Sequence, residues 1–197
     1  MTAIKDPVLY LKDTRPGPSI KRIRSVCIDG SRVPAYVIQE LNGCGVCGAA
    51  CLAAFASGGT SSFDTSLEHC LDVAKNGFTR TVNGTTDYYT RLGKEAPFVR
   101  KCLNAVSSGL TARSSLFAKR RAVKEILSGR PVLLNIGFSG QYRDHTVTAY
   151  GLEEYVVGPL GKRSLFFKVR DGYSKEDRYL LYRGILGISV TYLKPKA

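Results

Sequence analysis

The sequence contains only two histidines, His69 and His145, and it has no apolar run near the ~18–20 residues that a membrane-spanning helix needs. We therefore expect no membrane span. It also lacks low-complexity tracts and internal repeats, and its hydrophobic fraction of 44% is ordinary for a globular protein. The first twenty residues hold no continuous apolar segment of the secretory type, so we expect no signal peptide there, which leaves the location open. A chain of 197 residues is long enough for one core, and we expect a single domain, residues 1–197.

Acidic residues are scarce beside basic ones. The chain has 29 Lys and Arg against 16 Asp and Glu, a net charge of +13. Such a balance favours anionic partners, namely nucleic acid, an acidic protein surface or anionic lipid. The basic clusters are short, at 21–24, 119–121 and 194–196, and no aromatic residues alternate with them as a nucleic-acid site would require. We therefore expect a solvated basic surface and an acidic polypeptide as partner, rather than nucleic acid.

Helix and strand patterns occupy different parts of the chain. The pattern of residues 1–20 predicts an extended segment, and one or two strand patterns follow within 21–39. Helical patterns then recur, at about 47–57, 66–75, 96–106 and 116–128. From residue 131 five strand patterns alternate with glycine-rich and charged turns. This segregation predicts an α+β fold, with a helical half at about 40–130 and an antiparallel β half at about 131–197.

Three of the six cysteines lie in NGCGVCGAACLAAF, residues 42–55. A structural zinc site needs four ligands, usually in two close pairs, and no second pair accompanies Cys44 and Cys47. An iron–sulfur cluster would lack its fourth thiolate. We therefore expect no metal and no other cofactor. Neighbouring helical cysteines make poor disulfide partners, and the sequence leaves open whether Cys44, in the loop, is disulfide-bonded.

A cysteine in the first turn of a helix suits nucleophilic chemistry, because the helix N-terminus lowers the thiol pKa. Cys47 opens the predicted helix and is the expected nucleophile. His145 begins the strand pattern HTVTAYG and is the expected base, whereas His69 falls on the polar face of its helix and is predicted to be a surface histidine. Asp171 ends the next strand, which antiparallel pairing would bring beside the start of the His145 strand, so it is the expected orienter of His145.

Together these motifs resemble the papain-like cysteine peptidases, most closely the bacteriocin-processing branch that cleaves double-glycine leaders. The similar segments are CGAACLAAFASGG, SGRPVLLNIGF, DHTVTAYGLEEY and FFKVRDGYS, the last resembling a Val-x-Asp-x-aromatic motif. The likeness covers about residues 35–175. It implies a papain-like fold with the cleft between its two halves. It also implies a Cys47–His145–Asp171 triad that cleaves peptide bonds through a thioester acyl-enzyme.

The resemblance leaves the oxyanion donor open. Papain-like enzymes usually carry Gln six residues before the nucleophile, where this chain has Leu41. Asn42, five residues before, resembles the arrangement in picornavirus leader proteases and is the expected donor, with Gln39 as the alternative. One such donor is worth ~3 kcal/mol in the transition state. A further alternative makes Cys44 the nucleophile, which would put Gln39 five residues before it, although the helix pattern after Cys44 fits less well.

Two other functions are consistent with the same residues. The triad could serve a deamidase or acyltransferase, as in some bacterial virulence effectors of this fold, because the geometry is shared. Alternatively, the chain could be a non-catalytic basic binding module that keeps the fold.

Overall fold

The structure is a computed structural model that describes residues 4–15, 19–38, 43–77, 79–82, 85–88, 95–106, 109–137, 144–185 and 188–196. Within these ranges the fold is α+β. The α-helices are α1 (Pro7–Thr14), α2 (Cys44–Ala56), α3 (Phe63–Lys75), α4 (Glu95–Ala105) and α5 (Lys119–Leu127). The strands of the main sheet are β1 (Ile20–Cys27), β4 (Leu110–Leu116), β5 (Val132–Ile136), β6 (His145–Val157), β7 (Lys162–Arg170), β8 (Arg178–Leu181) and β9 (Ile188–Pro195). A separate hairpin consists of β2 (Thr79–Val82) and β3 (Thr85–Tyr88).

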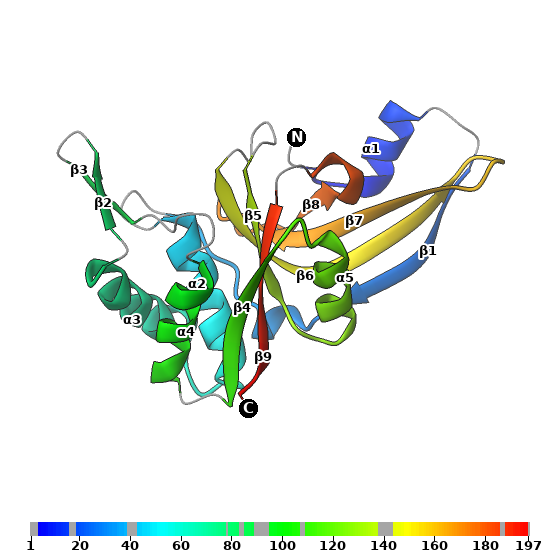
Figure 1. The fold of residues 1–197 in the computed structure, drawn as a ribbon. Helices are drawn as coiled ribbons and strands as arrows, with labels where there is room; N and C mark the ends of the chain where they lie inside the picture. The colour runs from blue at the N-terminus through cyan, green and yellow to red at the C-terminus, as the bar shows by residue number, and fades with distance from the viewer. Residues whose placement is uncertain are drawn as a thin grey trace.

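The main sheet is antiparallel and seven-stranded among the described residues, in the order β4-β9-β5-β6-β7-β8 with β1 beside β6. Strand β6 organises it: its first residues pair with β5, its later residues pair with β1, and β7 runs along its other edge. All five residues of β5 and nearly all of β6 are buried, so both sheet faces are covered there. Figure 1 shows the β6–β7 hairpin extending away from α2, α3 and α4.

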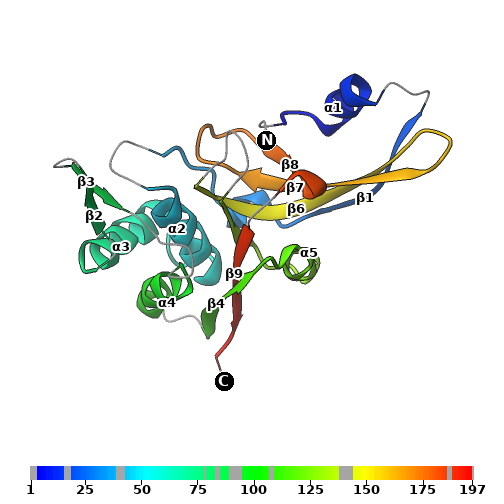
Figure 2. The same ribbon diagram turned by 45° about the horizontal axis from the view of Figure 1, so that its top comes forward.

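Helices cover both faces of the sheet. One apolar cluster joins α2, α3 and α4 to Leu133 of β5 and Tyr150 of β6. A second joins α5 to Val132 and Leu134 of β5, and a third joins Leu11 of α1 to Tyr155 and Phe166. Because successive residues of a strand point to opposite faces, the alternation along β5 assigns one face to each of the first two clusters. Figure 2 shows α5 on the side of the sheet away from α2. No described helix has the length and apolar character needed to cross a bilayer.

Helix α2 is the centre of the helical layer, with every residue from Gly45 to Phe55 buried. It lies very close to the sheet at Gly48. A Cβ there would lie 2.9 Å from Leu133 Cδ2 and 3.5 Å from Thr146 Cγ2. Glycine therefore permits a helix-to-sheet approach that a side chain would obstruct. The approach sets the N-terminal turn of α2 against the start of β6.

Most predicted elements are present, but the structure differs from the predictions at two places. Residues 7–14 form α1 rather than an extended lead-in, since Asp6 caps the helix by accepting from two backbone N–H groups and Pro7 suits its first position. Strand β4 was not predicted, and the helix expected from residue 116 begins at Lys119 because β4 pairs with β9 up to Leu116. One or two strands were expected within residues 21–39, and the described part of that range contains one, β1, with no strand at residues 35–38. Since β1 and β4 join the sheet, helices and strands are less segregated than predicted.

Candidate active site

Helix α2 begins at Cys44, three residues before the predicted start. Gly43 is its N-cap residue, and the Gly43 carbonyl accepts the N–H of Val46 at 2.9 Å and that of Cys47 at 3.1 Å. Cys44 is therefore the first helical residue. At that position the unpaired N–H groups and the helix dipole stabilise a thiolate.

The sulfur of Cys44 meets the first two residues of β6. The backbone N–H of Thr146 donates to Cys44 Sγ at 3.3 Å, and the Cys44 thiol is hydrogen-bonded to the His145 ring. Burial by itself would raise the pKa of Cys44. The hydrogen bond and charge of His145, with the hydrogen bonds of Thr146, outweigh burial and hold the pKa of Cys44 below its ordinary value of 9.0.

His145 is buried and held from two sides. Its Nε2 lies 2.7 Å from the main-chain carbonyl oxygen of Asp171, and the ring of Tyr173 stacks on it with centroids 4.7 Å apart and an interplanar angle of 14°. A carbonyl only accepts, so Nε2 carries a hydrogen and Nδ1 is left for the thiol. Burial would lower the pKa of His145, but Cys44 and then Asp171 raise it above its ordinary 6.5. The shifts of the two groups favour a thiolate–imidazolium pair.

Asp171 lies beside His145, as antiparallel pairing of β6 with β7 predicted, but it reaches His145 through its main-chain carbonyl. Its carboxylate Oδ1 accepts the N–H of Tyr173 at 3.0 Å, and its charge helps to raise the pKa of His145. Gly172 makes the turn between the two residues with a φ of 77°, and a Cβ there would lie 2.5 Å from Ile38 Cδ1. Glycine at this position therefore lets Asp171 and Tyr173 both face His145.

The structure pairs Cys44 with His145. Cys47 lies in the second half of the first helical turn with its side chain 1% exposed, inside the core cluster. Burial, and then the charge of Cys44, raise the pKa of Cys47 to about 12. The prediction that Cys47 opens the helix is wrong, because the helix starts at Cys44. The role of nucleophile stays a prediction, and the contact with His145 favours the alternative, Cys44.

Asn42 and Gln39, the predicted oxyanion donors, lie outside the described residues, as does Leu41. His69 was predicted to be a surface residue, but it is half-buried on α3 and its Nε2 is enclosed with no hydrogen-bond partner among the described residues.

Sequence reasoning missed two groups that position the pair. Tyr173 was present in the Val-x-Asp-x-aromatic pattern, but nothing in the sequence indicated that its ring would cover His145. Asn135 of β5 is the second: its Oδ1 accepts from Thr146 Oγ1 at 2.8 Å and its Nδ2 donates to Ser189 Oγ at 3.0 Å. This buried network supports Thr146, whose N–H contacts the Cys44 sulfur.

All six cysteines belong to the described residues, and none forms a disulfide, Cys44 included. Within the same residues no three His, Cys, Asp or Glu side chains gather in a way that could hold a metal ion. Cys44 and His145 place a thiol beside an imidazole.

Comparison of the sequence with known proteins finds no matching family model and no matching curated protein.

Proposed function

We propose that this protein is a papain-like cysteine peptidase with Cys44 as nucleophile, His145 as general acid and base, and Asp171 as the group that orients His145. The observation that carries the proposal is the hydrogen-bonded contact between Cys44, at the start of a buried helix, and His145, at the start of the central strand. The contact lowers the pKa of the thiol and raises that of the imidazole. Thiol acyl transfer requires this kind of activated nucleophile.

The proposed reaction has two steps. The Cys44 thiolate attacks the substrate carbonyl carbon, and as the peptide C–N bond breaks the His145 imidazolium gives its proton to the leaving amine. The neutral imidazole then removes a proton from water, which attacks the thioester and releases the carboxylic acid product and the thiol. The backbone N–H of Cys44, in the first turn of α2, is a donor for the oxyanion formed in each step.

The position of the pair supports a peptidase over a simple redox thiol. The nucleophile comes from a helix and the base from a strand of the opposing sheet, so that the two halves of the fold meet at the site. The net charge of +13 favours an acidic polypeptide as substrate.

Mass spectrometry of the products of a mixed peptide library tests the proposal. We expect new peptide termini with the unmodified protein and with Cys47→Ala, the matched control from the same helix, and none with Cys44→Ala or His145→Ala. Conversion of glutamine to glutamate without new termini would assign the pair to deamidation instead. Cleavage that survives in Cys44→Ala and is lost in Cys47→Ala would refute the assignment.

A further inference from the structure

Most of the net charge lies on two segments that are adjacent in the structure. Residues 100–130 contain eight Lys and Arg and one acidic residue, Glu125, while residues 178–196 contain four Lys and Arg and no acidic residue. Strand β4 of the first segment pairs along its whole length with β9 of the second. Glu125 is buried and bound by Arg121 and Arg130, so it does not offset the other cations at the surface.

An exposed apolar pair stands at the turn between β4 and α5. Leu116 is 59% exposed and Phe117 is 78% exposed. Phe117 has a φ of 51°, in the left-handed region that bulky residues rarely adopt, and its N–H donates to the Ile188 carbonyl at 2.8 Å. The backbone thus holds a large apolar side chain out in solvent, in a strained conformation that costs free energy of folding. Such a feature is typical of an apolar contact surface.

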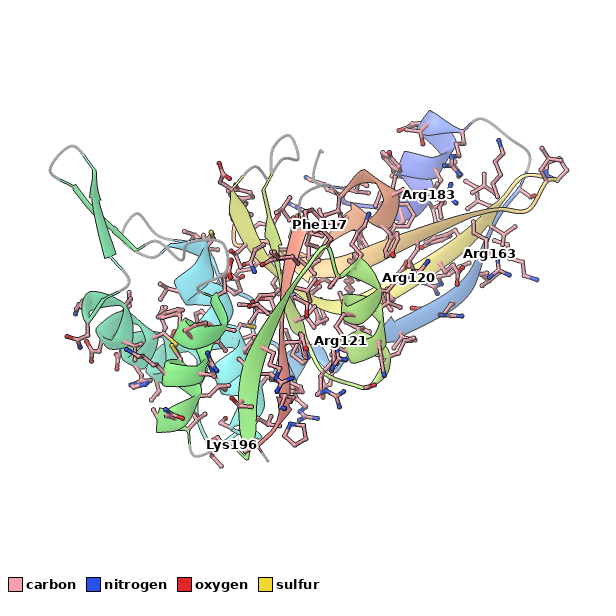
Figure 3. The ribbon with its side chains drawn as sticks, in the orientation of Figure 1. Phe117, Arg120, Arg121, Arg163, Arg183 and Lys196 are labelled. Carbon is pink, nitrogen blue, oxygen red and sulfur yellow. The ribbon has the colours of Figure 1, made fainter. Side chains whose placement is uncertain are left out.

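Cations without acidic partners surround this pair. Arg120 and Lys124 lie one helical turn apart on the exposed side of α5, three and seven residues after Phe117. Arg183 lies in the turn that meets the start of α5, since Lys119 Nζ donates to the carbonyls of Tyr182 and Ile185, at 3.1 Å and 3.0 Å. Figure 3 shows Phe117, Arg120 and Arg183 around the start of α5.

In the part of the chain that the structure describes, Arg120, Lys124 and Arg183 form no ion pair, whereas arginines elsewhere do. Arg163, near the tip of the β6–β7 hairpin, is paired with Glu154 at 3.3 Å. Cations without an ion pair also lie elsewhere in the described part of the chain, for example Lys21 and Lys162. What distinguishes Arg120, Lys124 and Arg183 is their place near the exposed apolar pair.

We propose that the face formed by Leu116, Phe117, Arg120, Lys124 and Arg183 docks on an anionic lipid bilayer. Phe117 and Leu116 would enter the boundary between headgroups and acyl chains, and the three cations would lie against anionic headgroups. A nucleic acid fits less well, because strand recognition needs several aromatic rings for bases to stack on, and the second apolar residue here is a leucine.

The strand register puts this docking face and the proposed active site at the same end of the sheet. His145 is opposite Ile136, Ile136 is opposite Ile188, and Leu116 is opposite Ser189. Since neighbouring strands lie about 4.8 Å apart, three strand spacings, or about 14 Å, separate the His145 and Leu116 positions. Docking would therefore hold the site near the membrane surface. This consequence rests on the proposed function, whereas docking itself does not.

Cosedimentation with lipid vesicles tests the docking. We expect the full chain to bind vesicles of phosphatidylcholine with phosphatidylserine, to ignore vesicles of phosphatidylcholine alone, and to bind less as salt is raised. Phe117→Asn should weaken binding about tenfold by removing the apolar ring. The fold should survive, because asparagine tolerates a positive φ. Arg120→Gln with Lys124→Gln should weaken binding about 25-fold, or about fivefold for each cation.

Leu160→Asn is the matched control, since Leu160 is 82% exposed at the β6–β7 turn and lies outside the docking face. Its binding should equal that of the unmodified protein, and the thermal midpoint of each variant checks its fold. The proposal is overturned if phosphatidylserine vesicles do not retain the protein, or if Leu160→Asn loses binding while Phe117→Asn keeps it. Retention of a single-stranded RNA oligonucleotide, lost in the double variant and without vesicle binding, would overturn it in favour of nucleic acid.

Discussion

Thiol alkylation separates Cys44 from the other cysteines quantitatively. A thiol with the ordinary pKa of 9.0 is about 1% thiolate at pH 7, whereas a pKa of about 12, that of Cys47, leaves about 0.001%. Cys27 is exposed and has its pKa raised above 9.0 by partial burial, so it serves as an internal reference at or below about 1% thiolate. Cys44 lies below 9.0 and therefore holds more thiolate than either residue.

The assay is a time course of iodoacetamide labelling at pH 7, followed by peptide mapping. We expect Cys44 to be modified first, Cys27 more slowly, and Cys47 only after unfolding. In His145→Ala, burial is no longer offset by the hydrogen bond and charge of the imidazole, so the pKa of Cys44 rises and its labelling falls to the rate of Cys27 or below. His69→Ala, the matched control, should leave the rate of Cys44 unchanged. Labelling of Cys47 ahead of Cys44, or a Cys44 rate that is the same in His145→Ala, would refute the reasoning.

Three further predictions concern the geometry of the pair. Gly48→Ala should lower the free energy of unfolding by about 1–3 kcal/mol, measured in a thermal melt, because its Cβ would press on Leu133 and shift α2. The shift of α2 should also reduce the labelling rate of Cys44, and an unchanged rate would contradict the close approach of helix and sheet. Tyr173→Ala should reduce turnover about tenfold through loss of the ring stacked on His145, while Tyr173→Phe keeps it; equal loss in both would give the role to the hydroxyl. The reaction rate should rise with pH on an acidic limb whose midpoint lies below 9.0, because the pKa of Cys44 is lowered. It should fall on an alkaline limb whose midpoint lies above 6.5, because the pKa of His145 is raised. Midpoints at 9.0 and 6.5 would contradict the thiolate–imidazolium pair.

Local patterns predicted the elements well where a segment is decided by its own periodicity. Four predicted helices and six predicted strands are present, since amphipathic spacing and turn residues specify them without distant contacts. Strand β4 was missed because its pattern, LTARSSL, has little alternation and depends on pairing with β9, about 80 residues later in the chain. Helix α1 was missed because Pro16 and Pro18 suggested an extended segment, although Asp6 is a strong cap before Pro7.

The sequence by itself indicated that His145 and a cysteine of residues 44–51 belong to one site, because the chain has one strand histidine and one cysteine-rich helix start. Only the tertiary structure decided which cysteine. Cys44, Cys47 and Cys51 follow one another at intervals of one helical turn, so local periodicity places all three on similar sides of α2. The choice depends on where the start of β6 crosses the helix, and that crossing is set by the contact of Gly48 with Leu133 and Thr146, residues about 90 positions away in the chain.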